Sequence, residues 1–204
     1  MYGAIREYKL GPGMRDELIR KVHAEFAAIT NVPGLLTYTV VLPGPADVVT
    51  TSIFEHQAAA EASVQQAADP FCATFDSVAE PRVTLGEITV RHVHENAAAG
   101  YGVMRRFACK SEHAELISTR VREGLVPILN DMPGFVSFGL LIEPDRDRGG
   151  VSLTAFADRA AAEAGNDQSL AWVKANVGGF LTKPPEVLVG EIKLRHVRSR
   201  VGAG

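Results

Sequence analysis

Hydrophobic and polar positions alternate along the first half of this chain in two distinct periods. Short runs rich in β-branched residues predict four strands, at residues 2–8, 35–42, 48–54 and 83–94. Apolar residues at helical spacing predict a helix at 14–30 and a second helical stretch at 56–78 that breaks near Asp69-Pro70. The resulting order, βαββαβ, is that of a ferredoxin-like unit, in which two helices cover one face of an antiparallel sheet.

The second half of the chain follows the same pattern. Strands are predicted at 101–109, 135–142, 151–156 and 187–197, and helices at 112–129 and 158–181. A polar stretch at 143–150 predicts a long turn between the second and third of these strands. Each half therefore predicts its own ferredoxin-like unit.

The two halves are also repeats at the level of residues. Gly86–Val93 and Gly190–Val197 agree at six of eight positions, 104 residues apart. Pro33-Gly34 returns as Pro133-Gly134. We interpret the chain as two tandem units, 1–95 and 100–200, joined by a short linker of small residues.

The second strand of each repeat indicates how the units are arranged. Neither face of 35–42 or 135–142 carries a charge, whereas a strand with one wet face alternates apolar with charged residues. Helices cover only one face of such a sheet, so the sheet of the other repeat is the natural cover for the second. The predicted fold is α+β, with two antiparallel sheets facing each other as an α+β barrel. Thr39 and Gly139 on these strands fit a small cavity, and they equally fit a solid core.

Composition excludes several function classes. Apolar residues make up 46% of the chain and the net charge is -3, which gives no electrostatic footprint for nucleic acid. We expect no signal peptide and no membrane span. Cys72 and Cys109 occupy non-equivalent positions of the repeat, which argues against a disulfide and fits a reducing cytoplasm. No cluster has the spacing of metal ligands, and no glycine-rich loop suits a phosphate.

Several residues together resemble a known family. Pro-Gly follows the first helix of each repeat, Phe54 closes the third strand before an Ala/Glu-rich helix, and Asp69-Pro70-Phe71 lies further along that helix. This pattern resembles the antibiotic biosynthesis monooxygenase superfamily of dimeric α+β barrels, in a tandem form. The resemblance implies a cofactor-independent monooxygenase acting on a small hydrophobic aromatic substrate.

The family's catalytic residues are not kept at the matching positions. Cofactor-free members use an Asn, a Trp, a Tyr and an Arg, and this chain has Thr50, Phe54, Ala60 and Asp76 in the first half and Ser152, Phe156 and Ala162 in the second. Haem-degrading members use an Asn, a Trp and a His, and this chain has Arg6, Gln65 and Phe75, then Arg105, Asn166 and Asn176. We therefore expect no haem, flavin or metal cofactor. The alternative function is a non-catalytic barrel that binds a small ligand or serves a structural role.

Candidate site residues remain in both repeats. His92 and His196 are the only histidines matched between the repeats, so they are candidates for a general base and equally for residues kept for packing.

For the substrate we single out Trp172, which could stack on a flat ring, and Asn166, which could donate or accept one directed hydrogen bond. Gly139, Arg105 and Tyr101 complete this set. We predict that the second half holds the larger pocket. The expected partners are a small hydrophobic molecule and, as a further possibility, a second copy of the tandem chain.

Overall fold

The computed structural model describes residues 1–11, 13–66, 80–94, 97–144 and 149–198. The chain forms two compact units: Met1–Leu85 with Lys193–Gly204, and Gly86–Ile192. Each unit has a hydrophobic core of its own.

The first unit contains the elements expected from its hydrophobic periodicity. They are β1 (Tyr2–Lys9), α1 (Met14–Thr30), β2 (Leu35–Leu42), β3 (Asp47–Phe54) and α2 (Gln57–Gln66). Strand β3 pairs antiparallel with both β1 and β2. Leu18 and Val22 of α1 are buried against this sheet, as their helical spacing requires. The second piece of the predicted helical stretch, with its break at 69–70, lies outside the described residues.

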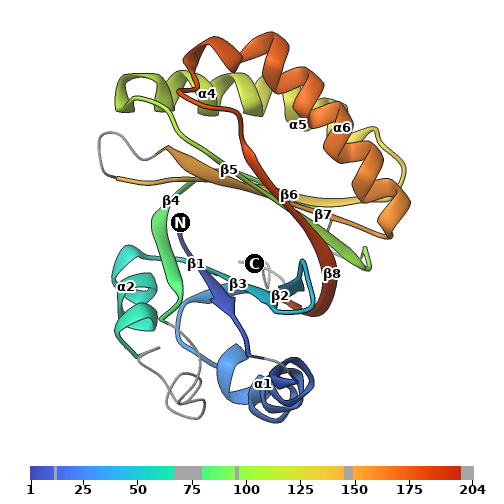
Figure 1. Ribbon diagram of the computed structural model, residues 1–204. Coiled ribbons are helices and arrows are strands. Elements are labelled where there is room, and N and C mark those ends of the chain that lie inside the picture. The colour runs from blue at the N-terminus through green and yellow to red at the C-terminus, as the bar shows by residue number, and fades with distance from the viewer. Residues whose placement is uncertain (12, 67–79, 95–96, 145–148, 199–204) are drawn as a thin grey trace, which may run out of the picture. The chain divides into compact units, whose positions relative to one another are not determined.

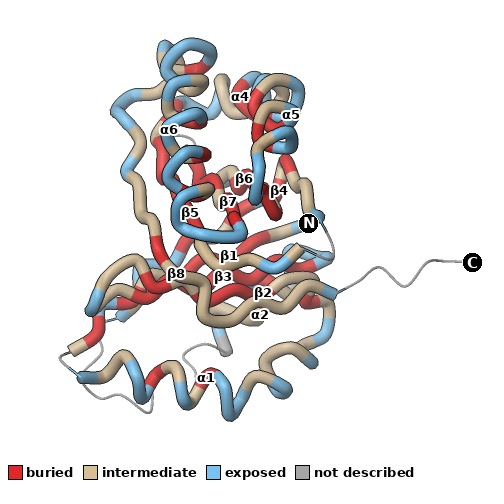
Figure 2. The backbone as a smooth tube through the Cα atoms, turned by 90° about the vertical axis from the view of Figure 1, so that its right-hand side faces the viewer, coloured by how far each residue is buried: buried red, intermediate tan, exposed pale blue. Residues whose placement is uncertain are grey.

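The second unit repeats the pattern. It contains β5 (Tyr101–Phe107), η1 (Ser111–His113), α4 (Ala114–Arg120), η2 (Val121–Leu125), α5 (Val126–Asn130), β6 (Phe135–Ile142), β7 (Gly150–Phe156), α6 (Arg159–Asn176) and η3 (Gly178–Phe180). Strand β7 pairs antiparallel with β5 and with β6. Helices α4, α5 and α6 lie together over one face of this sheet (Figure 1). Buried, intermediate and exposed residues alternate along α6, as expected of a helix with one face on a sheet (Figure 2).

The last strand of each repeat passes from one unit into the other. Strand β4 (Arg82–Val93) pairs with β6 from Glu87 to Val93, and β8 (Glu186–Val197) pairs with β5 from Glu186 to Glu191. Just beyond β8, the Arg198 amide donates to the carbonyl of Leu36. The compact units therefore do not end where the repeats 1–95 and 100–200 end, because the last part of each repeat's final strand belongs to the other unit.

The hydrogen-bonded strand order closes on itself. It runs β1-β3-β2-β8-β5-β7-β6-β4 and forms a closed barrel. The predicted α+β barrel built from two βαββαβ repeats is confirmed. Strands β2 and β6 contain no exposed residue, so both of their faces are covered, as the lack of charges predicted.

The repeated Pro-Gly pair has a backbone reason. Gly34 and Gly134 both have φ of 76°, in the left-handed region where a side chain is strained. Both glycines lie in the turn that connects a helix to the next strand. Among the described residues, no helix combines the length and apolar character needed to cross a membrane.

Candidate functional site

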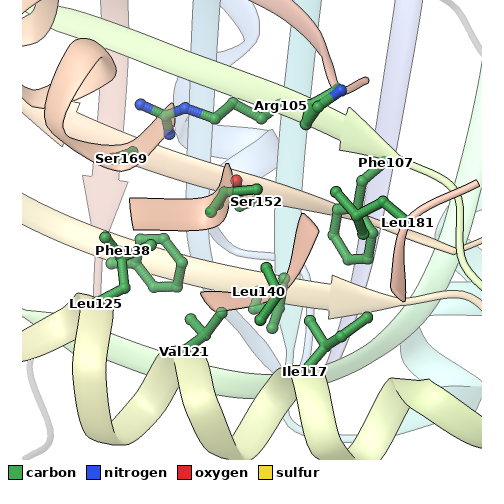
Figure 3. A pocket seen from close by; sticks show the side chains of 13 residues that line it. Arg105, Phe107, Ile117, Val121, Leu125, Phe138, Leu140, Ser152, Ser169 and Leu181 are labelled. Atoms are coloured by element: carbon green, nitrogen blue, oxygen red, sulfur yellow. The ribbon is translucent and has the colours of Figure 1, made fainter. Parts of the chain in front are cut away.

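A pocket lies inside the second unit, between its helices and the face of β5, β6 and β7 that these helices cover. Its apolar lining comes from both layers: Phe107, Ile117, Val121, Leu125, Phe138, Leu140, Val173, Val177, Leu181 and Pro185. Among the described residues, those of polar type that line it are Arg105, Ser152 and Ser169. Figure 3 shows the side chains of Ile117, Val121 and Leu125 on the helical side and Arg105 on the opposite side. The pocket is thus an apolar space with one permanent cation.

Arg105 is held at this position by two neutral partners. Its Nε donates to Oδ1 of Asn166 at 3.1 Å, and its Nη1 donates to Oγ1 of Thr154 at 3.1 Å. The side chain is buried, with the residue 3% exposed, and Nη2 has no hydrogen-bond partner. Burial lowers the pKa of Arg105 from its ordinary value to about 10, so the guanidinium stays charged at neutral pH. A buried cation with an unused N–H₂ group is an anchor for an oxygen acceptor.

In the first unit, Nη2 of the equivalent arginine already makes two hydrogen bonds. Arg6 donates from Nη2 to the carbonyl of Ser63 at 2.9 Å and to Oγ of Ser63 at 3.0 Å. The repeat places Gly165 of α6 where Ser63 stands on α2. Gly165 has no hydroxyl group, and its carbonyl already accepts from Ser169 at 2.6 Å. The free Nη2 of Arg105 therefore follows from a serine-to-glycine difference between the repeats.

One wall of the pocket is a widened helical turn. The segment η2 is a π-helix, in which the Val126 amide donates to the carbonyl of Val121, five residues back. Pro127 follows directly; it has no amide hydrogen, and in a regular α-helix its ring would clash with the carbonyl four residues earlier. The widened turn avoids this clash, and it carries two lining residues, Val121 and Leu125. π-turns of this kind occur frequently at functional sites.

The segment after α6 closes another side of the pocket. Val177, Leu181 and Pro185 contribute to the lining, and the Thr182 amide donates to the carbonyl of Ala108 at 2.9 Å. The enclosed volume is about 40 Å³. That is room for a few water molecules, whereas a cavity of about 150 Å³ is known to hold benzene. An aromatic ring would therefore enter only after the lining side chains or this segment had moved.

The structure brings together two of the residues named for substrate binding. Arg105 lines the pocket, and Asn166 holds its guanidinium from α6. Trp172 instead packs on the helix opposite: a Cβ on Gly124 would lie 2.7 Å from Cζ2 of its ring. The next residue, Val173, lines the pocket in its place.

The remaining two substrate candidates do not line this pocket. Gly139 lies between Phe138 and Leu140 on β6, so it faces the other side of the sheet, where a Cβ would meet no atom within 4 Å. Tyr101 begins β5, opposite Phe156 of β7, and packs against the core of the second unit. Their role in ligand binding stays a prediction.

The two candidate catalytic histidines belong to different units and neither lines the pocket. The Nε2 atom of His92 lies 2.9 Å from Oδ1 of Asn130. His196 lies near Phe26 in the first unit, with ring centroids 6.3 Å apart, and its Nε2 is buried without a hydrogen-bond partner. Burial and, less strongly, the charge of Arg198 lower the pKa of His196.

Sequence reasoning missed several residues that build the pocket. Ser169 on α6 is fully buried, and Thr154 on β7 holds Nη1 of Arg105. The sequence could have indicated Ser169, because a serine among the apolar positions of a helix is unusual. It could not have indicated Thr154, since the partner of Thr154, Arg105, lies 49 residues away in the chain.

The comparisons with known proteins agree with this architecture. The sequence profile of the antibiotic biosynthesis monooxygenase family matches residues 1–68 and 100–174, once in each repeat. The chain belongs to the antibiotic biosynthesis monooxygenase family. A search of curated protein sequences finds no match.

Solved structures with the same fold include proteins whose names refer to oxygenase or oxidase chemistry. A presumed monooxygenase of Fusobacterium nucleatum subsp. nucleatum aligns with a TM-score of 0.76 at 9% identity, over 97% of this chain and 94% of its own. A presumed monooxygenase of Lactobacillus acidophilus aligns with a TM-score of 0.74 at 16% identity, over 96% of this chain and 95% of its own. An anthrone oxidase-like protein aligns with a TM-score of 0.66 at 15% identity, over 100% of this chain and 96% of its own. At these identities the likeness shows a shared fold. The substrate and the activity of this family member have to be argued from its own pocket.

Proposed function

We propose that this family member is a cofactor-independent monooxygenase for a small, hydrophobic aromatic molecule that carries an acidic oxygen. The observation that supports it is Arg105, a buried guanidinium with a free Nη2 in an otherwise apolar pocket. Such a site favours the anion of a phenol or an enol, because the ring replaces water on apolar walls while the oxygen accepts from the cation.

Binding the anion also prepares it for reaction with oxygen. A phenolate or enolate is electron-rich at its ring or α-carbon, so the substrate itself can supply the electrons that reduce O₂. For a CH₂ group flanked by aromatic rings, a new C–O bond forms, one oxygen atom stays as the carbonyl, and the other leaves as water with both hydrogens. The step balances without an external reductant. In this proposal Arg105 holds the negative charge on the substrate oxygen as the anion forms.

The described residues lining the pocket include no Asp, Glu, His, Cys or Tyr. This feature favours a substrate that is acidic enough to arrive as its own anion. It also supports the second candidate function, a binding protein that holds such an anion without turning it over.

The experiment compares binding with turnover. The protein would be mixed under air with anthrone, which has a CH₂ group between two aromatic rings and an acidic enol. O₂ uptake would be followed with an electrode, with Arg105→Met and Arg6→Met as matched variants. Uptake that is stimulated by the wild type and by Arg6→Met, and lost in Arg105→Met, would support the oxygenase. Binding without stimulated uptake would support the binding protein. Turnover unaffected by Arg105→Met would refute the assignment of this pocket.

A further inference from the structure

Two imidazole rings and an amide oxygen converge at a separate place in the second unit. Nε2 of His92 and Nε2 of His94 each lie 2.9 Å from Oδ1 of Asn130. His94 and Asn130 are exposed to solvent, and His92 is partly buried. The two rings are close to each other, with centroids 5.3 Å apart.

The backbone explains why the two rings point the same way. His92 is on β4, opposite Phe138 of β6, and the His94 amide donates to the carbonyl of Val136, which continues this ladder beyond the end of the strand. Alternate residues of an extended chain face the same side, so His92 and His94 do as well. Asn130 is the last residue of α5 and comes to them from the helical layer.

The ring of Phe135 packs against both imidazole rings. Its centroid lies 5.9 Å from that of His92 and 5.5 Å from that of His94, and Phe135 is itself buried and packed on Phe156. The imidazoles are therefore oriented before anything binds, which lowers the entropic cost of holding a ligand between them.

We propose that His92, His94 and Asn130 form a binding site for a divalent transition-metal ion of the Cu²⁺, Ni²⁺ or Zn²⁺ class. Imidazole nitrogen is a preferred ligand for these ions. In the unbound site each Nε2 carries the proton that it donates to Oδ1 of Asn130. On metal binding each ring loses the proton on Nε2 and takes one up on Nδ1 through solvent, so that Nε2 is offered to the metal. Asn130 gives up its two hydrogen bonds and offers Oδ1, and water fills the remaining positions.

The ligand set defines a moderate, open site. Within the described part of the chain, no group of three or more His, Cys, Asp or Glu residues is placed to hold a metal ion. The proposed site has two imidazoles and a neutral amide, so it should exchange its metal readily. It does not require a metal to be retained through purification.

The other repeat lacks this arrangement and acts as an internal control. The positions that correspond to His92, His94 and Asn130 are His196, Arg198 and Thr30. Arg198 brings a positive charge instead of a second imidazole, and Oγ1 of Thr30 donates to the carbonyl of Ala27. One metal ion per chain is therefore expected.

The test uses the full chain with Zn²⁺ in isothermal titration and Cu²⁺ in electron paramagnetic resonance. We expect one equivalent to bind, with superhyperfine coupling from two imidazole nitrogens on Cu²⁺. His94→Gln should weaken Zn²⁺ binding by at least about tenfold, the range seen when metal sites lose supporting groups. Asn130→Asp should strengthen it, because a carboxylate replaces an amide.

His56→Gln is the matched control, since His56 is also exposed and has no second imidazole beside it among the described contacts. It should bind Zn²⁺ as the wild type does. No binding, or equal losses in His56→Gln and His94→Gln, would overturn the proposal and leave only scattered surface histidines. Circular dichroism of each variant would show that its fold is intact.

Discussion

Arg105 on β5 donates a hydrogen bond from Nε to Oδ1 of Asn166 on α6, over 3.1 Å. This contact joins the strand layer to the helical layer at the edge of the pocket. It also fixes which nitrogen of the guanidinium is left over, because Thr154 takes Nη1 and only Nη2 remains unused. The anchor of the pocket is therefore oriented by its own neighbours.

Replacing Arg105 should separate ligand binding from stability. Arg105→Met loses two hydrogen bonds, and it also removes a buried charge whose hydrogen-bond partners, Asn166 and Thr154, are both neutral. These effects oppose each other, so we expect the free energy of unfolding to stay within about 1 kcal/mol of the wild type in urea titrations. Affinity for 4-nitrophenolate should fall by about 30-fold or more, because truncating a buried, hydrogen-bonded charge costs about 2–5 kcal/mol.

The controls for this variant come from the chain and from the ligand. Arg6→Met changes the equivalent arginine, whose Nη2 is tied to Ser63, and should leave the affinity unchanged. 4-Nitroanisole has the same ring without an acidic oxygen and should bind wild type and Arg105→Met equally. A large loss of 4-nitroanisole affinity in Arg105→Met would mean that the substitution has collapsed the pocket.

Gly124 should tolerate no side chain while Trp172 is present. A Cβ at Gly124 would lie 2.7 Å from Cζ2 of Trp172, in the larger ring of the indole. Gly124→Ala should cost about 1–3 kcal/mol of unfolding free energy through overpacking. In a Trp172→Phe background the cost should shrink, because the clashing ring is gone.

A double-mutant cycle measured by urea unfolding tests this coupling. Gly179→Ala is the control, since a Cβ there meets no atom within 4 Å, and it should change stability by no more than about 0.5 kcal/mol. Additive effects of Gly124→Ala and Trp172→Phe would contradict the contact. Trp172 is the only tryptophan, so its fluorescence also reports movement of the η2 wall when a ligand binds.

His196 should make the protein less stable in acid. Burial, with a smaller contribution from Arg198, lowers its pKa below the ordinary value of 6.5. The unfolded chain then binds a proton more readily than the folded chain, so stability falls as the pH drops below about 6.5 and the loss levels off below the folded pKa.

Urea unfolding at pH 8 and pH 5 measures this effect. His196→Gln should reduce the difference in unfolding free energy between the two pH values, and His56→Gln, an exposed control, should not. The prediction fails if His196→Gln leaves the acid loss as large as in the wild type.

The Cys109 thiol should be protected in the folded protein. The residue is 2% exposed, and burial raises the pKa of the thiol, so less of the reactive thiolate is present near neutral pH. Iodoacetamide should modify the Cys109 peptide at least about tenfold more slowly in native protein than in guanidinium chloride, as read by mass spectrometry. Equal rates would show that the segment around Leu181, which bridges to Cys109, opens freely.

Much of the fold could be predicted because its determinants are local. The bounds of α1, β2 and β6 follow from periodicity and from the turn residues beside them, and the repeat doubled every signal. The sequence pattern could not predict that β4 and β8 pass between the units, since strand pairing depends on contacts far apart in sequence. The π-turn was also missed: periodicity reads 112–129 as one continuous helix, and only Pro127 marks the widening.

Part of the site could also be predicted, because the repeat shows which positions correspond. Arg105 and Asn166 could be named from repeat positions and residue chemistry, although their mutual bond could not. Trp172 was chosen for its chemistry, yet a helix turns by about 100° per residue, so its neighbour Val173 takes the lining position. The unused Nη2 depends on a missing hydroxyl at Gly165, a difference that has meaning only once α6 is placed over β5.

The path of β4 and β8 has a consequence for how the protein reaches its fold. Each repeat carries a strand that completes hydrogen bonding with strands of the other repeat. Two severed repeats would have to find each other in solution, so their folding would depend on concentration, as it does for an obligate dimer. The covalent link at 97–100 replaces that encounter with an intramolecular one at a high effective concentration. The intact chain should therefore refold with a rate and a midpoint that do not change on dilution.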